Sequence, residues 1–150
     1  AMQTFLNHPD QWRLLADRPD LGPAAVEEVM RVNPTVRWVT REVLEDFEYD
    51  GLLLRAGTTV HLYSESAGTD PRAFESGFDI TAERKPHFGF GGGAHHCLGH
   101  FVARSDMSDA LPLLARRLRE PSPLPGATWL PDSGNTGPIR LPMAFTPGPA

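Results

Sequence analysis

The spacing of apolar positions predicts two helices near the start of the chain. Residues 8–18 begin with His-Pro-Asp, which places a proline and an acid in the first turn, and they carry apolar side chains at helical spacing until Pro19. Residues 24–31 show the same periodicity. Because Pro34 disfavours the helical conformation at Asn33, we expect this second helix to end there.

The next part of the chain is predicted to form strands. Residues 36–39 favour a strand, and Asp50-Gly51 between apolar runs indicates a hairpin over residues 47–54 with a two-residue primed turn. Residues 58–63 alternate as a further strand. Residues 70–90 show no sustained period, so we expect ordered irregular chain, and a loop of that length in a compact domain is usually functional.

Helical spacing returns after Cys97, in residues 98–118. Pro112 should kink this helix or begin a second helical segment. From Pro121 onward the chain is predicted to be mostly irregular, with a short edge strand in residues 137–145. Together these elements predict an α+β domain that is mainly α with small β-sheets.

Length, composition and charge narrow the class of protein. The 150 residues suffice for one domain, and we treat Ala1, before Met2, as an addition outside the folded sequence. No apolar run approaches a membrane span, and a net charge of −5 argues against nucleic acid as a partner. A single cysteine excludes an internal disulfide. We therefore expect a cytoplasmic protein without a membrane or nucleic-acid partner.

The most unusual stretch is the glycine- and histidine-rich run that leads to Cys97, the only cysteine. A buried free thiol is the commonest fate of a lone cysteine, but it does not account for the neighbouring glycines and histidines. Zinc could use Cys97 with His95, His100 and His87, although structural zinc usually takes paired ligand clusters and only one cluster is present. Both alternatives explain only part of the run.

Two further interpretations concern cofactors. The spacing of Gly89, Gly91 and Ala94 is similar to a dinucleotide fingerprint, but no buried strand precedes it. A haem thiolate accounts for the whole run. A following helix favours the Cys97 thiolate, glycines let the backbone pass close beneath a flat macrocycle, and Phe90 would shield the sulfur from water. We therefore favour haem ligation by Cys97.

Here the sequence resembles a known family. The pattern Phe90-Gly91-x-Gly93-x-His95-x-Cys97-x-Gly99 is similar to the haem-binding signature of the bacterial cytochrome P450 family, with all six fixed positions filled. Glu28-Val29-Met30-Arg31 resembles the family's Glu-x-x-Arg helix motif. In isolation such a pair would be an ordinary surface pair, whereas the resemblance implies a buried pair near the proximal side of the haem. The likeness runs from residue 4 to Phe145.

The resemblance implies a fold and a set of site residues. The fold would be the C-terminal, proximal part of a cytochrome P450: a helix pair, a β-hairpin region, an irregular meander, the cysteine loop and the following helix, as one domain over residues 1–150. Haem b would be held by Cys97 as iron ligand, with His95 and Arg41 at the positions that bind its propionates. The remaining cofactor-binding positions would be Phe90, Gly91, Gly93 and Gly99.

The resemblance also implies an activity, with departures. A complete member would insert one oxygen atom of O₂ into an organic substrate, with electrons from a ferredoxin-type donor. The family usually has an arginine in the slot of Ala82 that completes the Glu28–Arg31 pair, and Arg84, two residues later, could replace it. Of the family's long distal helix, Thr4-Phe5-Leu6 would be about the last turn, and its oxygen-activating residues have no counterpart in this sequence. No catalytic residue is therefore predicted, and the chain alone should be inactive.

These departures lead to two further expectations and an alternative. A haem on this chain would leave apolar surface in water, so we expect weak or absent haem retention and self-association through the exposed haem face. The alternative is a non-catalytic, truncated module that binds no haem and acts through protein partners. The sequence leaves the organic substrate open.

Overall fold

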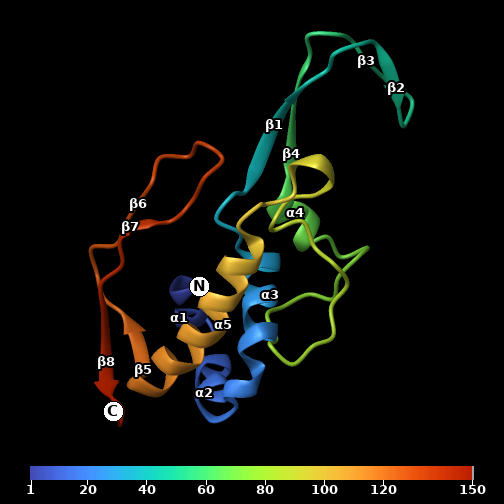
Figure 1. Ribbon diagram of the computed structural model, residues 1–150. Helices are drawn as coiled ribbons and strands as arrows, with labels where there is room; N and C mark the ends of the chain where they lie inside the picture. The colour runs from blue at the N-terminus through green and yellow to red at the C-terminus, as the bar shows by residue number, and fades with distance from the viewer. Residues whose placement is uncertain (150) are drawn as a thin grey trace.

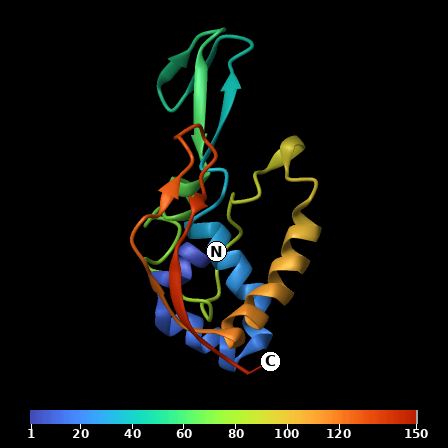
Figure 2. The same cartoon turned by 90° about the vertical axis from the view of Figure 1, so that its left-hand side faces the viewer.

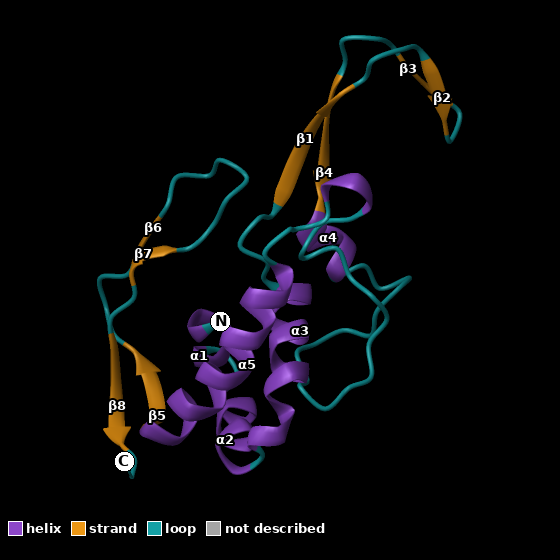
Figure 3. Ribbon diagram, in the orientation of Figure 1, coloured by secondary structure: helices purple, strands orange, loops and turns teal. Residues whose placement is uncertain are grey.

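Helices form the body of the protein, and short strands form arms that leave it (Figures 1 and 3). The computed structural model describes residues 1–149. The helices are α1 (Met2–Leu6), α2 (Pro9–Asp17), η1 (Pro19–Leu21), α3 (Gly22–Val32), α4 (Ser64–Gly68), η2 (Gly93–His95) and α5 (His100–Arg117). The strands are β1 (Trp38–Glu42), β2 (Phe47–Tyr49), β3 (Leu52–Leu54), β4 (Thr59–Tyr63), β5 (Leu118–Pro123), β6 (Thr128–Trp129), β7 (Pro138–Arg140) and β8 (Met143–Pro147).

The two predicted N-terminal helices are confirmed as α2 and α3. Pro9 occupies the first turn of α2, where its missing N–H has no helical partner to lose. Helix α3 ends at Val32, just before the residue that Pro34 keeps out of the helical conformation. Local sequence therefore defines both ends of this helix pair.

The core lies where α1, α2, α3 and α5 pack together. It also takes in Phe78 and Ile80 from the irregular segment between α4 and η2. Each such buried side chain contributes on the order of 1.5–3 kcal/mol of transfer free energy. The long irregular segment is therefore packed onto the helices by its apolar residues. The buried core consists of Phe5, Trp12, Leu15, Ala25, Val26, Val29, Phe78, Ile80, Leu111 and Ala115.

The predicted hairpin and strands form an arm at the top of Figure 1. β1 pairs antiparallel with β4, and β2 pairs antiparallel with β3. Asp50 and Gly51 adopt φ values of 51° and 75°, which is the primed turn that the Asp-Gly pair predicts. Most side chains of β2 and β3 are exposed.

The C-terminal region is mostly irregular, as predicted, but it contains more strands than the one expected. β5 pairs with β8 and β6 pairs with β7, and both β7 and β8 overlap residues 137–145, where the edge strand was predicted. β5 reads Leu-Arg-Glu-Pro-Ser-Pro, which has low strand propensity, so the distant partner β8 and not the local sequence makes it a strand. Helix α5 continues through Pro112, so of the two predicted alternatives, a kink or a second helical segment, the second is excluded.

Helix α5 connects the cysteine loop to the C-terminal strands. The loop that contains Cys97 precedes its first residue, and β5 follows its last (Figure 2). Its second half carries the buried residues Leu111, Pro112 and Ala115, which pack in the core, while Phe101 and Val102 near its start are exposed. No helix within residues 1–149 is long and apolar enough to cross a bilayer.

Candidate functional site

Cys97 lies exposed at the end of a tightly hydrogen-bonded loop. Its N–H donates to the carbonyl of Phe90 at 2.9 Å, and its own carbonyl accepts from the N–H of His100 at 3.3 Å. Inside the loop, Gly91 and Gly93 have φ values of 74° and 62°, a left-handed conformation that favours glycine. The glycines of the signature therefore permit the turn that presents the thiol.

The surroundings of Cys97 suit a flat apolar group with a soft metal at its centre. Phe88, Leu98 and Phe101 flank the cysteine in sequence and are 59%, 98% and 76% exposed. Contiguous exposed apolar surface usually marks a binding site, and these three exposed side chains lie within 14 residues of sequence around Cys97. A thiolate is also a preferred ligand for haem iron. The residues present therefore fit a haem.

The other predicted cofactor-binding residues differ in their exposure and in the element that carries them. The ring of Phe90 is buried, and Gly99 is the residue immediately before α5. His95 is exposed in η2. Arg41 is exposed on β1, and the only hydrogen bond of its side chain within residues 1–149 goes to the carbonyl of Thr40 at 2.8 Å. No hydrogen bond in this described part of the chain links Arg41 to the cysteine loop.

Glu28 and Arg31 form a buried ion pair on α3. Each side chain is 2% exposed, and the guanidinium holds both carboxylate oxygens at 2.7 Å. Arg31 also donates to the carbonyls of Gly68 at 2.6 Å and Gly77 at 2.7 Å. One arginine therefore joins α3 to α4 and to the irregular segment. Nothing in the sequence pattern indicated the two carbonyl contacts.

Arg84 occupies the third position of this network. Its terminal nitrogen lies 3.1 Å from Glu28 Oε1, and the N–H of Asp79 donates to the same oxygen at 3.0 Å. Arg84 thus supplies the cation that the slot of Ala82 lacks. Its own Nε is buried without a hydrogen-bond partner in residues 1–149, so the fit is imperfect. Burial acts to raise the pKa of Glu28, but the bonds from Arg31, Asp79 and Arg84 outweigh it and hold this pKa below its ordinary value.

Glycine also holds the cysteine loop close to α3. A Cβ added at Gly89 would collide with the backbone carbonyl of Met30 in α3. Only a residue without a side chain allows this approach, which brings the start of the loop next to the helix that carries Glu28 and Arg31. Gly89 belongs to the glycine-rich run that leads to Cys97, but its contact with α3 is visible only in the folded chain.

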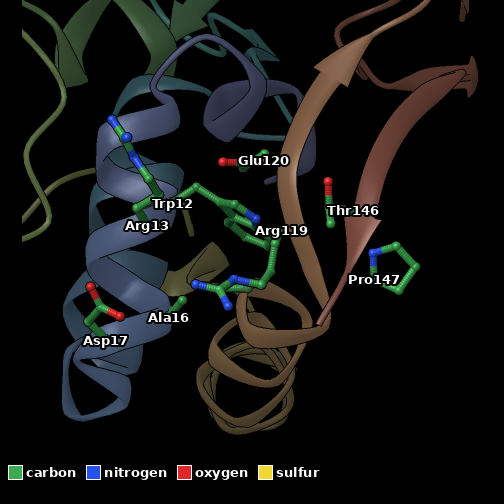
Figure 4. Close-up of a pocket in the computed structure, with 9 residues that line it drawn as sticks. Trp12, Arg13, Ala16, Asp17, Arg119, Glu120, Thr146 and Pro147 are labelled. Atoms are coloured by element: carbon green, nitrogen blue, oxygen red, sulfur yellow. The ribbon is translucent and has the colours of Figure 1, made fainter. Parts of the chain in front are cut away.

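Neither of two other places in the protein combines the predicted cofactor-binding residues. Within the described residues, no three His, Cys, Asp or Glu side chains come together as a metal site, so His87, His95, Cys97 and His100 do not form the zinc cluster. A hollow of about 320 Å³ lies between α2, β5 and β8 (Figure 4). Trp12, Arg13 and Glu120 contribute to its lining, and none of its lining residues is a predicted cofactor-binding residue.

Solved structures share this arrangement of helix pair, irregular segment and cysteine loop. The crystal structure of CalO2 has a TM-score of 0.90 at 37% identity, covering 99% of this chain and 38% of that chain. P450BioI, solved in complex with an acyl carrier protein ligated to hexadec-9Z-enoic acid, has a TM-score of 0.88 at 33% identity, covering 97% and 38%. The fold is therefore a portion of the cytochrome P450 fold.

Sequence comparison agrees with the fold. The cytochrome P450 family pattern matches residues 3–123, so the chain belongs to the cytochrome P450 family. It is 43% identical to luteothin monooxygenase of Streptomyces thioluteus over 149 residues, which is 97% of this chain and 37% of that protein. It is 38% identical to nocardicin C N-oxygenase of Nocardia uniformis subsp. tsuyamanensis, covering 97% and 38%. The chain thus spans well under half the length of these relatives.

Proposed function

We propose that this chain is the haem-thiolate portion of a bacterial cytochrome P450 monooxygenase and that Cys97 is the iron ligand. The observation that carries the proposal is the exposed thiol of Cys97 at the end of the glycine loop, flanked by exposed apolar side chains. A lone cysteine of a globular protein is usually buried, so an exposed thiol in this setting favours a ligand role.

The chain's own residues would each contribute to holding the cofactor. Gly91 and Gly93 shape the loop, Phe90 anchors it in the interior, and Gly99 immediately precedes α5. His95 and Arg41 would donate to the propionates, and the exposure of both side chains supports this role. When bound, haem would supply the reductive activation of O₂.

The activity of the whole protein is inferred from its relatives. Their names as a monooxygenase and an N-oxygenase support oxygen transfer to an organic substrate. We propose a ferredoxin-type electron donor, a cytoplasmic location and a single folded domain. By itself, the 150-residue chain should hold haem weakly, because the face of the haem turned away from Cys97 would stay in water. It should lack turnover, because the oxygen-activating residues of the distal helix have no counterpart in this sequence. Without haem, the exposed side chains of Phe88, Leu98 and Phe101 should favour self-association.

Haem loading tests the proposal directly. We expect the purified chain, given hemin and then reduced under CO, to show a strongly red-shifted Soret band. Cys97→Ala should abolish the band, whereas the matched control His96→Ala, which changes an exposed neighbour, should keep it. A band that survives in Cys97→Ala would show that another residue binds the iron. A chain that takes up no hemin would overturn the haem proposal and favour the alternative of a non-catalytic module.

A further inference from the structure

Two adjacent glutamates of α3 bind different parts of the protein. Glu28 is buried against the irregular segment, whereas Glu27 is half-buried and binds residues on both sides of the cysteine loop. Arg104 Nε lies 2.5 Å from Glu27 Oε1, and another guanidinium nitrogen lies 3.1 Å from Oε2. His87 Nε2 lies 3.1 Å from the same Oε2. One carboxylate thus joins a residue before Cys97 to a residue after it.

His87 fixes the entry to the loop. Its side chain is 5% exposed, and its Nδ1 accepts the N–H of Gly89 at 3.0 Å. With Nδ1 as acceptor, Nε2 carries the proton and donates to Glu27. Burial lowers the pKa of His87 more than the Glu27 carboxylate raises it, which keeps the ring neutral at neutral pH. The glycine that contacts α3 is therefore held by a satisfied, neutral histidine.

Arg104 fixes the exit from the loop. Its guanidinium carbon lies 4.2 Å from the centroid of the Phe90 ring, and a terminal nitrogen lies 2.6 Å from His100 Nδ1. Phe90 in turn accepts the N–H of Cys97 through its carbonyl. Because Arg104 is on α5 and Phe90 is before the loop, their contact closes the loop from both sides.

We propose that Glu27 is a positioning residue for the Cys97 loop, acting through His87 and Arg104. This inference rests on the proposed function, because it concerns where the iron ligand is held. Glycine gives this loop backbone freedom, and the loop's own backbone hydrogen bonds join only residues between Phe88 and the first turn of α5 to one another. Glu27 ties the loop to α3, the same helix that Glu28 and Arg31 fix in the interior.

Amide hydrogen exchange on the haem-free 150-residue chain tests the proposal. Glu27→Gln removes the charge at constant size, and Asp109→Asn makes the same change at an exposed site of α5. We expect Glu27→Gln to speed exchange in residues 88–99 by roughly five- to tenfold, the effect of losing an ion pair and its coupled cation–π contact. Exchange in residues 38–63 should not change, and Asp109→Asn should match the wild type throughout.

Two further variants keep the test decisive. Arg104→Lys preserves the charge but loses the forked contact, so it should speed exchange in residues 88–99 by less than Glu27→Gln. Exchange in residues 88–99 should be no faster in the double variant Glu27→Gln/Arg104→Gln than in the faster of the single variants Glu27→Gln and Arg104→Gln, because the groups act as one unit. Should Glu27→Gln fail to fold, Arg104→Lys decides alone. After hemin loading, Glu27→Gln should also lower the fraction of the chain with the red-shifted reduced-CO band.

The outcomes separate this inference from the proposed function. Unchanged exchange in residues 88–99 in both Glu27→Gln and Arg104→Lys would show that Glu27 does not position the loop. Equal acceleration in residues 38–63 would assign Glu27 to general stability and would also overturn the inference. If the wild-type chain takes up no hemin, the haem proposal fails, while the exchange pattern still decides whether Glu27 holds the loop.

Discussion

Arg31 and Arg84 both contact Glu28, and replacing each of them should destabilise the protein to a very different extent. Arg31→Met removes both charge-assisted bonds to the carboxylate and leaves the carbonyls of Gly68 and Gly77 without these donors. Arg84→Met removes one bond of 3.1 Å to the carboxylate and a weak contact of 3.4 Å with the carbonyl of Glu75, together with the orphaned Nε. The structure therefore predicts an asymmetric network, in which Arg31 contributes most of the stabilisation.

The magnitudes follow from burial and bond count. Breaking a buried ion pair by removing one partner costs about 3–5 kcal/mol, and Arg31 and Glu28 are each 2% exposed. Arg84 is 12% exposed and makes one charged hydrogen bond to Glu28, so its loss should cost about 1–2 kcal/mol. Since domains are stable by only about 5–15 kcal/mol, Arg31→Met should leave little stability in reserve.

Urea unfolding followed by far-ultraviolet circular dichroism measures both effects. We expect both variants to have a lower urea midpoint than the wild type, with Arg31→Met far lower than Arg84→Met, and the dependence of the unfolding free energy on urea concentration should be unchanged. Arg55→Met, at a 73% exposed side chain, is the matched control and should lie within about 0.5 kcal/mol of the wild type. Equal losses for Arg31→Met and Arg84→Met would refute the asymmetry. A loss below about 1 kcal/mol for Arg31→Met would refute the buried-pair argument itself.

Three remaining predictions concern pH, the cysteine loop and the core. Because the folded pKa of Glu28 lies below its ordinary value, its contribution to the free energy of unfolding should be fully present above about pH 4.3 and be lost as the pH falls through the folded pKa. Measuring the free energy of unfolding during acid titration tests this, and a contribution that grows as the pH falls would contradict it. Gly89→Ala should lower the free energy of unfolding, measured with urea, by several kcal/mol. Gly99→Ala should lower it far less, because an added Cβ there meets nothing within 4 Å beyond its chain neighbours. Equal losses in the two variants would exclude the clash with α3. Trp12→Phe removes the indole N–H donated to the carbonyl of Leu118 at 2.8 Å and should lower stability by about 1–3 kcal/mol, and an unchanged thermal midpoint would contradict this.

Much of the fold could be predicted from sequence because the deciding interactions are local. The turn at Asp50-Gly51 follows from two residues that tolerate positive φ, and the end of α3 follows from the steric effect of Pro34. Strand β5 could not be predicted in this way, since its residues have low strand propensity and its partner β8 lies far along the chain. Helix α4 also went unpredicted, and it is only five residues long.

In the candidate site, too, local features could be predicted from the sequence and contacts between distant residues could not. By itself, the sequence determined that the only thiol, Cys97, follows a glycine-rich loop, because motif spacing and glycine's backbone freedom are properties of neighbouring residues. Only the tertiary structure decided that Arg84 reaches Glu28 across 56 residues and that Glu27 holds Arg104 across 77. Ion pairs between distant residues depend on where the core places each helix, and no local pattern of side chains specifies that distance.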